Sequence, residues 1–358
     1  VKISGGKFDI SAGTNGIKST NTETSDKGFI SVTGGSFTVV ANNDAFEAET
    51  VLSIEGGSFD ITTGGGSANA SMKSDGTPNS DWQNNMGNGG GGPNGMGRPD
   101  DNGNGTGGEP PAMPTADSTG LTIETAAANT TTDSTDTTDN TSTSAKALKA
   151  GNEVNISGGE FKIDSADDSV HSNGNIVITG GNISVASGDD GMHANGNLTI
   201  SDGTVDITKS YEGIEGSIVT IDGGTISVVA SDDGINCAGG SDTGSTDRMG
   251  ADQFSSQDGV ELNINGGTIT IDAEGDGLDS NGNFTMAGGT VYVCGPTNGG
   301  NGALDYNGTA TVTGGTLIAC GAVGMEEGFG DNSTQYSVLH DLGSTVSANK
   351  KLTITDSD

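Results

Sequence analysis

A pair of glycines followed two positions later by an apolar residue recurs through this chain about every 22 residues. The interval is 22 residues from Gly34 to Gly56 and again from Gly158 to Gly180. A period in the low twenties is typical of a solenoid, in which each repeat forms one coil and stacks on its neighbours. The pairs begin at Gly5, Gly34, Gly56, Gly158, Gly180, Gly223, Gly266, Gly288 and Gly314, and Asp202-Gly203 replaces the pair in one degenerate copy.

Each repeat contains short stretches in which apolar residues occupy every second position, and this is strand periodicity. In the copy that begins at Asn175, Ile176 and Ile178 precede the glycine pair, and Ile183 and Val185 follow it. The pattern predicts an all-β right-handed parallel β-helix of about ten coils, with roughly 22 residues per coil. Neighbouring coils are expected to lie about 4.8 Å apart.

Equivalent apolar positions of successive repeats predict two ladders in the core. The first comprises Phe8, Phe37, Phe59, Phe161, Ile183, Val205, Ile226, Ile269, Val291 and Leu317. The second comprises Ile17, Phe46, Leu148, Val170, Met192, Ile214, Ile235, Leu278 and Leu304. Only 30% of the chain is hydrophobic, which fits a thin solenoid better than a globule.

Breaks in the repeat divide the chain into segments. Residues 1–66 and 145–325 hold the predicted coils, the latter with a short insertion at 239–257. Residues 67–144 are rich in Gly, Asn, Ser, Thr and Asp, so we expect a largely disordered insertion. Residues 326–358 lose the repeat and are interpreted as the C-terminal cap that a solenoid needs.

The chain is strongly acidic, with 48 acidic and 13 basic residues and a formal net charge of -35. This charge argues against nucleic acid and anionic membrane surfaces as partners and favours cations. No apolar run is long enough to span a bilayer, so we expect no membrane insertion. We expect a monomer.

Two polar columns flank the second apolar ladder. The first contains Asn15, Asp44, Lys146, Asp168, Asp190, Glu212, Asp233, Asp276 and Gly302. The second, three residues later, contains Lys18, Glu47, Lys149, His171, His193, Glu215, Asn236, Asp279 and Asp305. Because carboxylates in adjacent coils would repel one another, the columns predict a bound cation.

Calcium suits these columns, because it accepts six to eight oxygen ligands in flexible geometry. The predicted ligands are Asp168, Asp190, Glu212, Glu215, Asp233, Asp276, Asp279 and Asp305, with Asp167, Asp189 and Asp232 as flanking candidates. The alternative is that these are solvated turn residues selected for turn propensity and solubility.

Histidine and cysteine offer further possibilities in the same repeats. His171 and His193 fall in adjacent coils, where they could hold a transition metal or serve a structural role. Cys294 and Cys320 share a repeat position and could form a disulfide or remain as stacked free thiols in the core. Cys237 has no partner in this register.

The repeat pattern resembles that of a known family. The segments "DDGMHANGNLTI" and, above all, Lys209–Gly216 ("KSYEGIEG") are similar to secreted bacterial carbohydrate-binding domain proteins described first in cellulose-degrading clostridia. The resemblance implies a pectate-lyase-like right-handed β-helix, loaded with calcium, that binds cellulose or acidic plant polysaccharides without cleaving them. Lys18, Lys146 and Lys149 depart from this pattern in the early coils.

The favoured prediction is therefore a non-catalytic, calcium-dependent polysaccharide-binding protein, extracellular or on a bacterial cell surface. Its ligand would be an acidic glycan such as polygalacturonate, or cellulose. Candidate sugar-stacking residues are Tyr211, Tyr292 and Tyr306, with Trp82 in the long insertion. Their scarcity favours acidic glycans over crystalline cellulose.

Two other functions remain open at this stage. A calcium-dependent polysaccharide lyase would need a base, for which Lys162 and Lys209 are weak candidates, since Arg98 and Arg248 fall in insertions. The other is a structural or adhesive cell-surface solenoid, which should bind no polysaccharide, or an ice-binding solenoid that relies on Thr-x-Thr positions in its strands.

Overall fold

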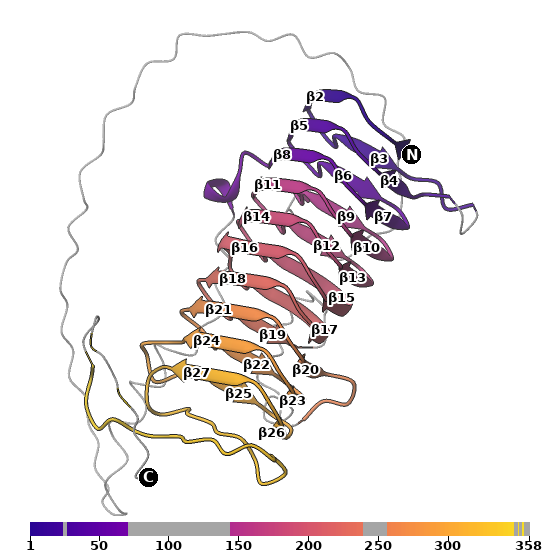
Figure 1. The fold of residues 1–358 in the computed structure, drawn as a ribbon. Helices are drawn as coiled ribbons and strands as arrows, with labels where there is room; N and C mark the ends of the chain where they lie inside the picture. The colour runs from indigo at the N-terminus through magenta and orange to yellow at the C-terminus, as the bar shows by residue number, and fades with distance from the viewer. Residues whose placement is uncertain (24–26, 71–143, 239–255, 347–349, 351–352, 354–358) are drawn as a thin grey trace, which may run out of the picture. The chain divides into compact units, whose positions relative to one another are not determined.

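The computed structural model describes residues 1–23, 27–70, 144–238, 256–346, 350 and 353, and these fold as a parallel β-solenoid (Figure 1). The strand pairings among them are all parallel. The one helical element in these ranges is the short 3-10 helix η1 (Ser67–Asn69). Two predicted insertions, 67–144 and 239–257, fall almost entirely outside the described residues. Trp82, Arg98 and Arg248 lie outside them as well.

One sheet takes a single strand from each repeat, and its outer face is in front in Figure 1. Inward and outward side chains alternate along these strands, as the sequence periodicity predicts. Its ten strands are β2 (Lys7–Ala12), β5 (Ser36–Ala41), β8 (Ser58–Thr63), β11 (Glu160–Ser165), β14 (Asn182–Ser187), β16 (Thr204–Lys209), β18 (Thr225–Ala230), β21 (Thr268–Ala273), β24 (Thr290–Cys294) and β27 (Thr316–Cys320).

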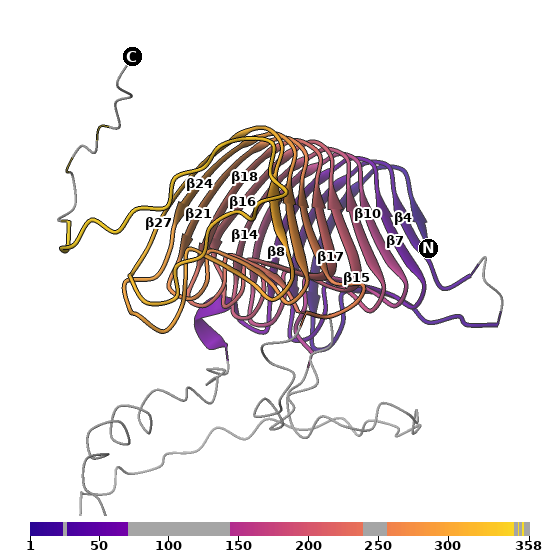
Figure 2. The ribbon, with the colours of Figure 1, turned by 90° about the horizontal axis from the view of Figure 1, so that it is seen from below.

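The second sheet closes the other sides of each coil, and the strands of both sheets follow one another along the stack in Figure 2. β15 and β17 run through a bend that other repeats break into two strands. Its strands are β1 (Lys2–Ile3), β3 (Ile17–Ser19), β4 (Ile30–Val32), β6 (Phe46–Ala48), β7 (Val51–Ile54), β9 (Leu148–Ala150), β10 (Glu153–Ile156), β12 (Val170–Ser172), β13 (Asn175–Ile178), β15 (Met192–Ile200), β17 (Ile214–Ile221), β19 (Ile235–Cys237), β20 (Glu261–Ile264), β22 (Leu278–Ser280), β23 (Asn283–Met286), β25 (Leu304–Tyr306) and β26 (Ala310–Val312).

Both predicted apolar ladders are confirmed by the strand register. Phe8, Phe37, Phe59 and Phe161 are partners in successive coils, and the first ladder continues to Leu317 without a slip. The second ladder runs in the same way from Ile17 to Leu304. The core between the two sheets is built from these ladders and from the apolar positions beside them.

The glycine pair is required by close approach between coils. Gly57, the second glycine of its pair, has a φ of +124°, which residues with a side chain rarely adopt. A Cβ there would lie 3.0 Å from the carbonyl oxygen of Gly35 and 3.2 Å from the ring of Phe59. The motif therefore lets each coil settle on the one before it and leaves room for the aromatic ring two residues later.

The described part of the predicted C-terminal cap adds hydrogen bonds to the last coil. Gly330 N–H donates to Ala310 O at 2.9 Å, and Thr334 N–H donates to Val312 O at 3.0 Å. The ring of Phe329 packs against Phe284 with 5.4 Å between centroids. No strand is assigned after β27 within the described residues, and Tyr336 and other apolar side chains that follow are exposed.

The three cysteines are free thiols in two different settings. Cys294 and Cys320 are register partners, as predicted, but both are exposed, so the interpretation of thiols stacked in the core is wrong for them. They occupy outward positions of β24 and β27, because the alternation of each strand places Val291 and Val293 inside. Cys237 is buried, and burial raises its pKa above the ordinary value. The described residues contain no helix with the length and apolar character needed to cross a membrane.

Candidate functional site

The corner at which each strand of the ten-stranded sheet turns toward the larger sheet carries the two polar columns. In the first column, a carboxylate accepts the backbone N–H of the next coil. Oδ1 of Asp168 accepts the N–H of Asp190 at 3.1 Å, and Oδ1 of Asp190 accepts the N–H of Glu212 at 3.2 Å. The same bond joins Asp44 to Lys146, Asp233 to Asp276, and Asp276 to Gly302. One oxygen of each of these carboxylates therefore accepts a backbone N–H, and the second oxygen can contact other groups at the corner.

Lys146 neutralises the first of the buried carboxylates. Its ammonium lies 2.8 Å from Oδ1 of Asp167 and 2.7 Å from Oδ2 of Asp168, and the side chain of Asp168 is fully buried. Burial alone would raise the pKa of Asp168, but the Lys146 ammonium and the bond to His171 outweigh burial and hold it well below its usual range. Burial also opposes the charge of Lys146, but the two aspartates reverse this effect and raise its pKa.

His193 supplies the next positive charge. Its Nδ1 lies 3.1 Å from Oδ2 of Asp190 and 2.6 Å from Oε2 of Glu215, and its Nε2 lies 2.9 Å from Oδ1 of Asn195. Burial by itself would lower the pKa of His193, but the hydrogen bonds to Asp190 and Glu215 raise it to about 12. The imidazole is therefore an imidazolium at neutral pH and neutralises part of the charge of both carboxylates.

His171 repeats the arrangement one coil earlier. Its Nδ1 lies 2.8 Å from Oδ2 of Asp168, and its Nε2 lies 2.9 Å from Oδ1 of Asn173. The rings of His171 and His193 stack with 5.0 Å between centroids. Because the ring nitrogens of both histidines already have partners, this geometry favours a structural role over ligation of a transition metal.

Beyond Glu215 the acidic columns continue without a basic side chain. Between Lys209 and His340 the sequence contains a single basic residue, Arg248, which lies outside the described ranges. Burial, followed by repulsion from neighbouring carboxylates, raises the pKa of Glu212 well above its usual value. The pKa values of Asp233 and Asp279 are raised well above the usual range in the same way, and that of Asp276 to about 7.

Asn236 lies in the middle of this uncompensated stretch. Its Cα pairs with those of Glu215 and Asp279 in the adjacent coils, and its Nδ2 donates to Oε2 of Glu212 at 2.9 Å. Its side-chain oxygen is buried and has no hydrogen-bond partner among the described residues. A buried acceptor without a donor is costly, and one surrounded by carboxylates is suited to a cation.

The predicted ligands are brought onto one corner but not into one cluster. Within the described ranges, the groups whose ligand atoms lie within 4.8 Å of one another are Asp168 with His171 and His193, Asp190 with His193 and Glu215, and Asp167 with Asp168 and Asp189. Asp276, Asp279 and Asp305 do not form such a group, although Asp279 and Asp305 are register partners. Asp232 lies beside Asp233 in the same turn and is half-buried.

Asn236 was not among the predicted ligands, although its place in the second column was visible in the sequence. Asn is common in turns, so only the burial of its side-chain oxygen distinguishes Asn236 from a turn residue.

The predicted sugar-contacting tyrosines lie in different parts of the solenoid. Tyr292 is on the outer face of β24 and is 44% exposed. Tyr306 is in β25, and its hydroxyl donates to the carbonyl of Gly328. Tyr211 lies in the turn between β16 and β17. They do not form a continuous aromatic platform.

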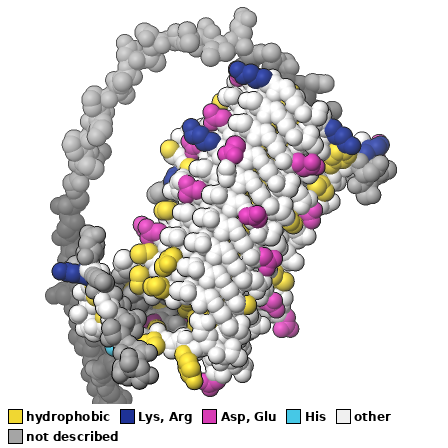
Figure 3. Space-filling view, in the orientation of Figure 1, with side chains coloured by type: hydrophobic (Ala, Val, Ile, Leu, Met, Phe, Trp, Pro, Cys, Tyr) yellow, Lys and Arg dark blue, Asp and Glu magenta, His cyan; other side chains and the backbone are white. Residues whose placement is uncertain are grey.

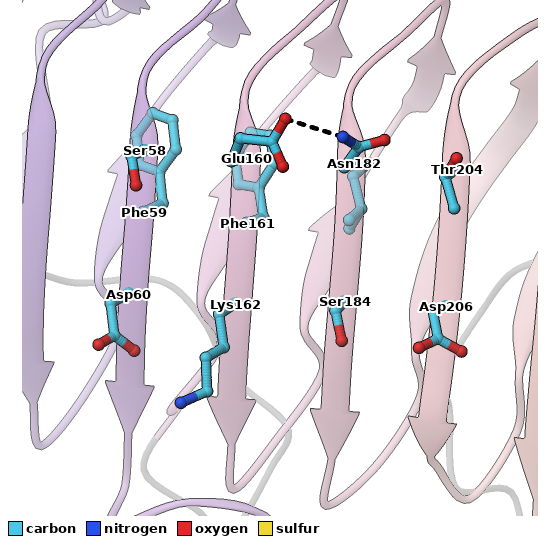
Figure 4. Close-up of a pocket in the computed structure, with 11 residues that line it drawn as sticks. Ser58, Phe59, Asp60, Glu160, Phe161, Lys162, Asn182, Ser184, Thr204 and Asp206 are labelled. Carbon is cyan, nitrogen blue, oxygen red and sulfur yellow. Dashed lines mark hydrogen bonds between the residues drawn. The ribbon is translucent and has the colours of Figure 1, made fainter.

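The two lysines considered as lyase bases also lie apart. The ammonium of Lys209 donates to the carbonyl of Ser67 at 2.5 Å, whereas Lys162 lies on the outer face of β11 (Figure 4). Neither is joined by a hydrogen bond or ion pair to a described carboxylate of the two columns.

The family described as carbohydrate-binding domain-containing protein matches residues 1–191 and 192–302. The chain belongs to this family. The two matches together span the solenoid up to the turn before β25, so they include the corner from Asp44 to Asp279. No curated protein and no solved structure matches this carbohydrate-binding domain protein.

The raised pKa values predict that the protein without metal becomes more stable in mild acid. Asp276 has a pKa of about 7 in the folded state and about 4 when unfolded. Between these values the folded state binds more protons, so the free energy of unfolding falls as pH rises from about 4 to 7. In the presence of a chelator, we expect a higher melting temperature at pH 5 than at pH 8.

The substitution Asp276→Asn tests the origin of this dependence. It should reduce the difference in melting temperature between pH 5 and pH 8 and raise stability at pH 8. If the protein melts at the same temperature at pH 5 and at pH 8 in the presence of a chelator, the assignment of raised pKa values to this corner is wrong.

Proposed function

We propose that this chain is a non-catalytic, calcium-dependent polysaccharide-binding protein, with an acidic glycan such as polygalacturonate as its ligand. Membership of the carbohydrate-binding domain family supports the carbohydrate partner. The observation that carries the calcium part is the buried oxygen of Asn236, which has no hydrogen-bond partner among the described residues and lies in the column between Glu215 and Asp279. The inferred fold is a right-handed, pectate-lyase-like solenoid of about ten coils, of the clostridial type.

The types of donor atom at this corner support calcium. Glu212, Glu215, Asn236 and Asp279 offer carboxylate and amide oxygens, and these are the ligands that calcium prefers. A calcium ion there would lower the pKa values that burial and mutual repulsion raise, because it favours the ionised carboxylates. Asp233, Asp276 and Asp305 continue the same oxygen-rich column.

The earlier part of the columns fits calcium less well. Asp168 and Asp190, which the sequence analysis included among the ligands, already face Lys146 and the imidazolium of His193. Glu47 faces Lys18 at 2.9 Å, and Asp44 faces Lys149 at 3.7 Å. We therefore propose that calcium binds between Glu212 and Asp305, where Glu215 faces His193 at 2.6 Å and no basic side chain among the described residues forms an ion pair with Glu212, Asp233, Asp276 or Asp279.

Exposure along the corner supports a role in glycan binding. Glu212, Glu215 and Asn236 are buried, whereas Asp232, Asp233, Asp276, Asp279 and Asp305 are half-buried and can be reached from solvent. An ion bound to the half-buried carboxylates could also accept the carboxylate of a uronate, which the net charge of -35 would otherwise repel. We further propose that the protein acts outside the cell or on a bacterial surface, where polysaccharides of this kind are found.

Calorimetry with calcium and polygalacturonate tests the proposal. We expect heat of calcium binding, and polygalacturonate binding that a chelator abolishes. Asp279→Asn should weaken calcium binding by about tenfold or more, because it removes a charged ligand. The matched control is Glu261→Gln, which removes the same charge from the outer face of β20.

Three results would contradict parts of this proposal. Absence of heat on adding calcium would exclude calcium binding. Equal weakening of calcium binding by Asp279→Asn and Glu261→Gln would leave only a general effect of charge. Release of unsaturated product from polygalacturonate, measured by absorbance, would replace the binding function with that of a lyase.

A further inference from the structure

Two exposed thiols lie side by side at the ends of the last two strands of the ten-stranded sheet. Cys294 is the final residue of β24 and Cys320 that of β27, and the two are register partners. Tyr292 and Ile318, which are also register partners, are exposed on the same two strands. Figure 3 shows apolar side chains near this end of the face. The thiols are therefore open to reagents in solution.

The spacing of the two strands fits a disulfide. Hydrogen-bonded strands lie about 4.8 Å apart, and register partners in a parallel pair are separated by about this distance. Disulfides join residues whose Cα atoms are about 4.4–6.8 Å apart. The pairing extends to the ends of both strands, because Gly295 N–H donates to the carbonyl of Cys320 at 2.8 Å. The backbone thus holds the two cysteines at a separation that a disulfide can bridge.

The side chain of Cys320 is directed toward its partner strand. Its Sγ lies 3.5 Å from the carbonyl oxygen of Val293, the residue that precedes Cys294. Burial raises the pKa of Cys320, and the thiol of Cys294, with which it interacts directly, raises it further. The two thiols are therefore neighbours in space as well as in register.

β27 can make the small adjustment that a disulfide requires. The Cβ atoms of a disulfide lie about 3.5–4.5 Å apart, slightly closer than the strand spacing. Within the described residues β27 is the last strand of its sheet and is paired only with β24. Most of its side chains are exposed, so few buried contacts oppose a shift toward β24.

We propose that Cys294 and Cys320 form an intramolecular disulfide that joins the last two coils when a low-molecular-weight disulfide is the oxidant. One thiolate attacks the oxidant, forms a mixed disulfide and releases one small thiol. The second thiolate attacks the mixed disulfide and releases the other. Two S–H bonds of the protein and the S–S bond of the oxidant are broken, while one S–S bond in the protein and two S–H bonds in the small thiols are formed.

The disulfide would close a loop over residues 295–319. This segment contains β25 and β26 and includes Asp305 at the end of the acidic columns. A cross-link restricts the unfolded chain, and the terminal coil of a solenoid gains most from it because that coil has a neighbour on one side only. The disulfide does not depend on the proposed function, since Cys320 lies beyond the residues that match the family and neither calcium nor glycan takes part.

A count of thiols after oxidation provides the main test. The reduced protein contains three thiols, and Cys237 is buried, so we expect it to remain unreacted in the folded chain. After treatment with oxidised glutathione at about pH 8.5 and in the presence of a chelator, the denatured protein should show one free thiol. Its mass should be lower by two hydrogen atoms, and peptide mapping should link Cys294 to Cys320.

Moving one thiol along its strand provides the matched control. Thr316→Cys combined with Cys320→Ser keeps the number of thiols and places the second one at another exposed position of β27. The register partner of Thr316 is Thr290, which lies about 13 Å along β24 from Cys294. We expect this variant to carry glutathione on both exposed thiols and to form no internal cross-link.

Hydrogen exchange measures whether the disulfide stabilises the last coils. Exchange of the amides in β25, β26 and β27 should slow by about tenfold or more on oxidation. Exchange in β2, at the other end of the sheet, should not change. A reductant should restore the original rates.

Four results would overturn this inference while leaving the calcium proposal intact. They are three free thiols after oxidation, a lasting glutathione adduct on Cys294 or Cys320 of the wild type, a cross-link between two chains on a non-reducing gel, and exchange in β25–β27 that oxidation does not slow. An internal cross-link formed equally well by the control variant would also contradict it, because register would then play no part.

Discussion

Replacing Lys146 with methionine is expected to lower the free energy of unfolding by about 3–5 kcal/mol, because it leaves buried carboxylates without their cation. The Lys146 ammonium lies within 2.8 Å of Asp167 and Asp168, and Asp168 is fully buried. Methionine keeps most of the volume of the lysine stem, so the cost would arise from the lost charge. Denaturant unfolding with and without calcium measures it.

Two comparison variants separate this effect from general damage to the corner. Lys149→Met removes a lysine that is 3.7 Å from Asp44 and whose side chain is 26% exposed, so we expect a cost of about 1 kcal/mol or less. Adding Asp168→Asn to Lys146→Met should recover part of the stability, because no ionised group then remains at that position. A cost for Lys146→Met no larger than that for Lys149→Met would contradict the role assigned to Lys146.

The melting temperature of Lys146→Met should also respond more strongly to calcium. Ligand atoms of Asp167, Asp168 and Asp189 lie within 4.8 Å of one another, so removal of the ammonium leaves an oxygen-rich group that calcium can neutralise. We therefore expect calcium to raise the melting temperature of Lys146→Met by more than it raises that of the wild type. An equal increase in both proteins would count against Lys146 as the substitute for a cation in this coil.

Replacing Phe59 with alanine is expected to cost about 3–5 kcal/mol of unfolding free energy, since it opens a cavity inside a continuous aromatic stack. The Phe59 ring stacks on Phe37 with 4.8 Å between centroids and on Phe161 with 4.6 Å. It also meets Phe46 edge to face at 5.8 Å. The coils on both sides fix the backbone, so we expect little collapse of the cavity.

Phe8→Ala is the matched control for this substitution. Phe8 occupies the same repeat position but is only half-buried and stacks on one ring of the ladder, that of Phe37 at 4.7 Å. We expect a cost of about 1–2 kcal/mol, in line with the smaller area that its ring removes from water. Similar costs for both substitutions would show that position along the stack does not govern the contribution of a ring.

Most of the fold could be predicted from the repeat, for a physical reason. In a parallel stack each repeat position lies above the same position of the previous coil, so aligning the repeats is the same operation as assigning strand register. This is why the ladders from Phe8 to Leu317 and from Ile17 to Leu304 are both correct without a slip. The outward direction of Cys294 and Cys320 was missed, although the alternation that places Val291 inside already implies it for Cys294.

The candidate site was predicted in outline but not in detail. Aligning the repeats placed Asp168, Asp190 and their equivalents in one column, yet it could not show that one oxygen of each is held by the next backbone N–H. It also treated Lys146 only as a departure from the pattern, whereas the structure shows its ammonium between Asp167 and Asp168.

The sequence by itself determined which residues of this solenoid lie above one another, because the spacing of the glycine pairs is a property of the chain alone. It also determined that the corner is acidic and that the outer row of the ten-stranded sheet becomes threonine after Asn182. Only the tertiary structure decided which carboxylates are paired with a basic side chain of the protein and which are not. That distinction depends on burial and on distances of a few ångströms between side chains in neighbouring coils, and Asn236, with its buried and unpartnered oxygen, lies where the protein's own cations end.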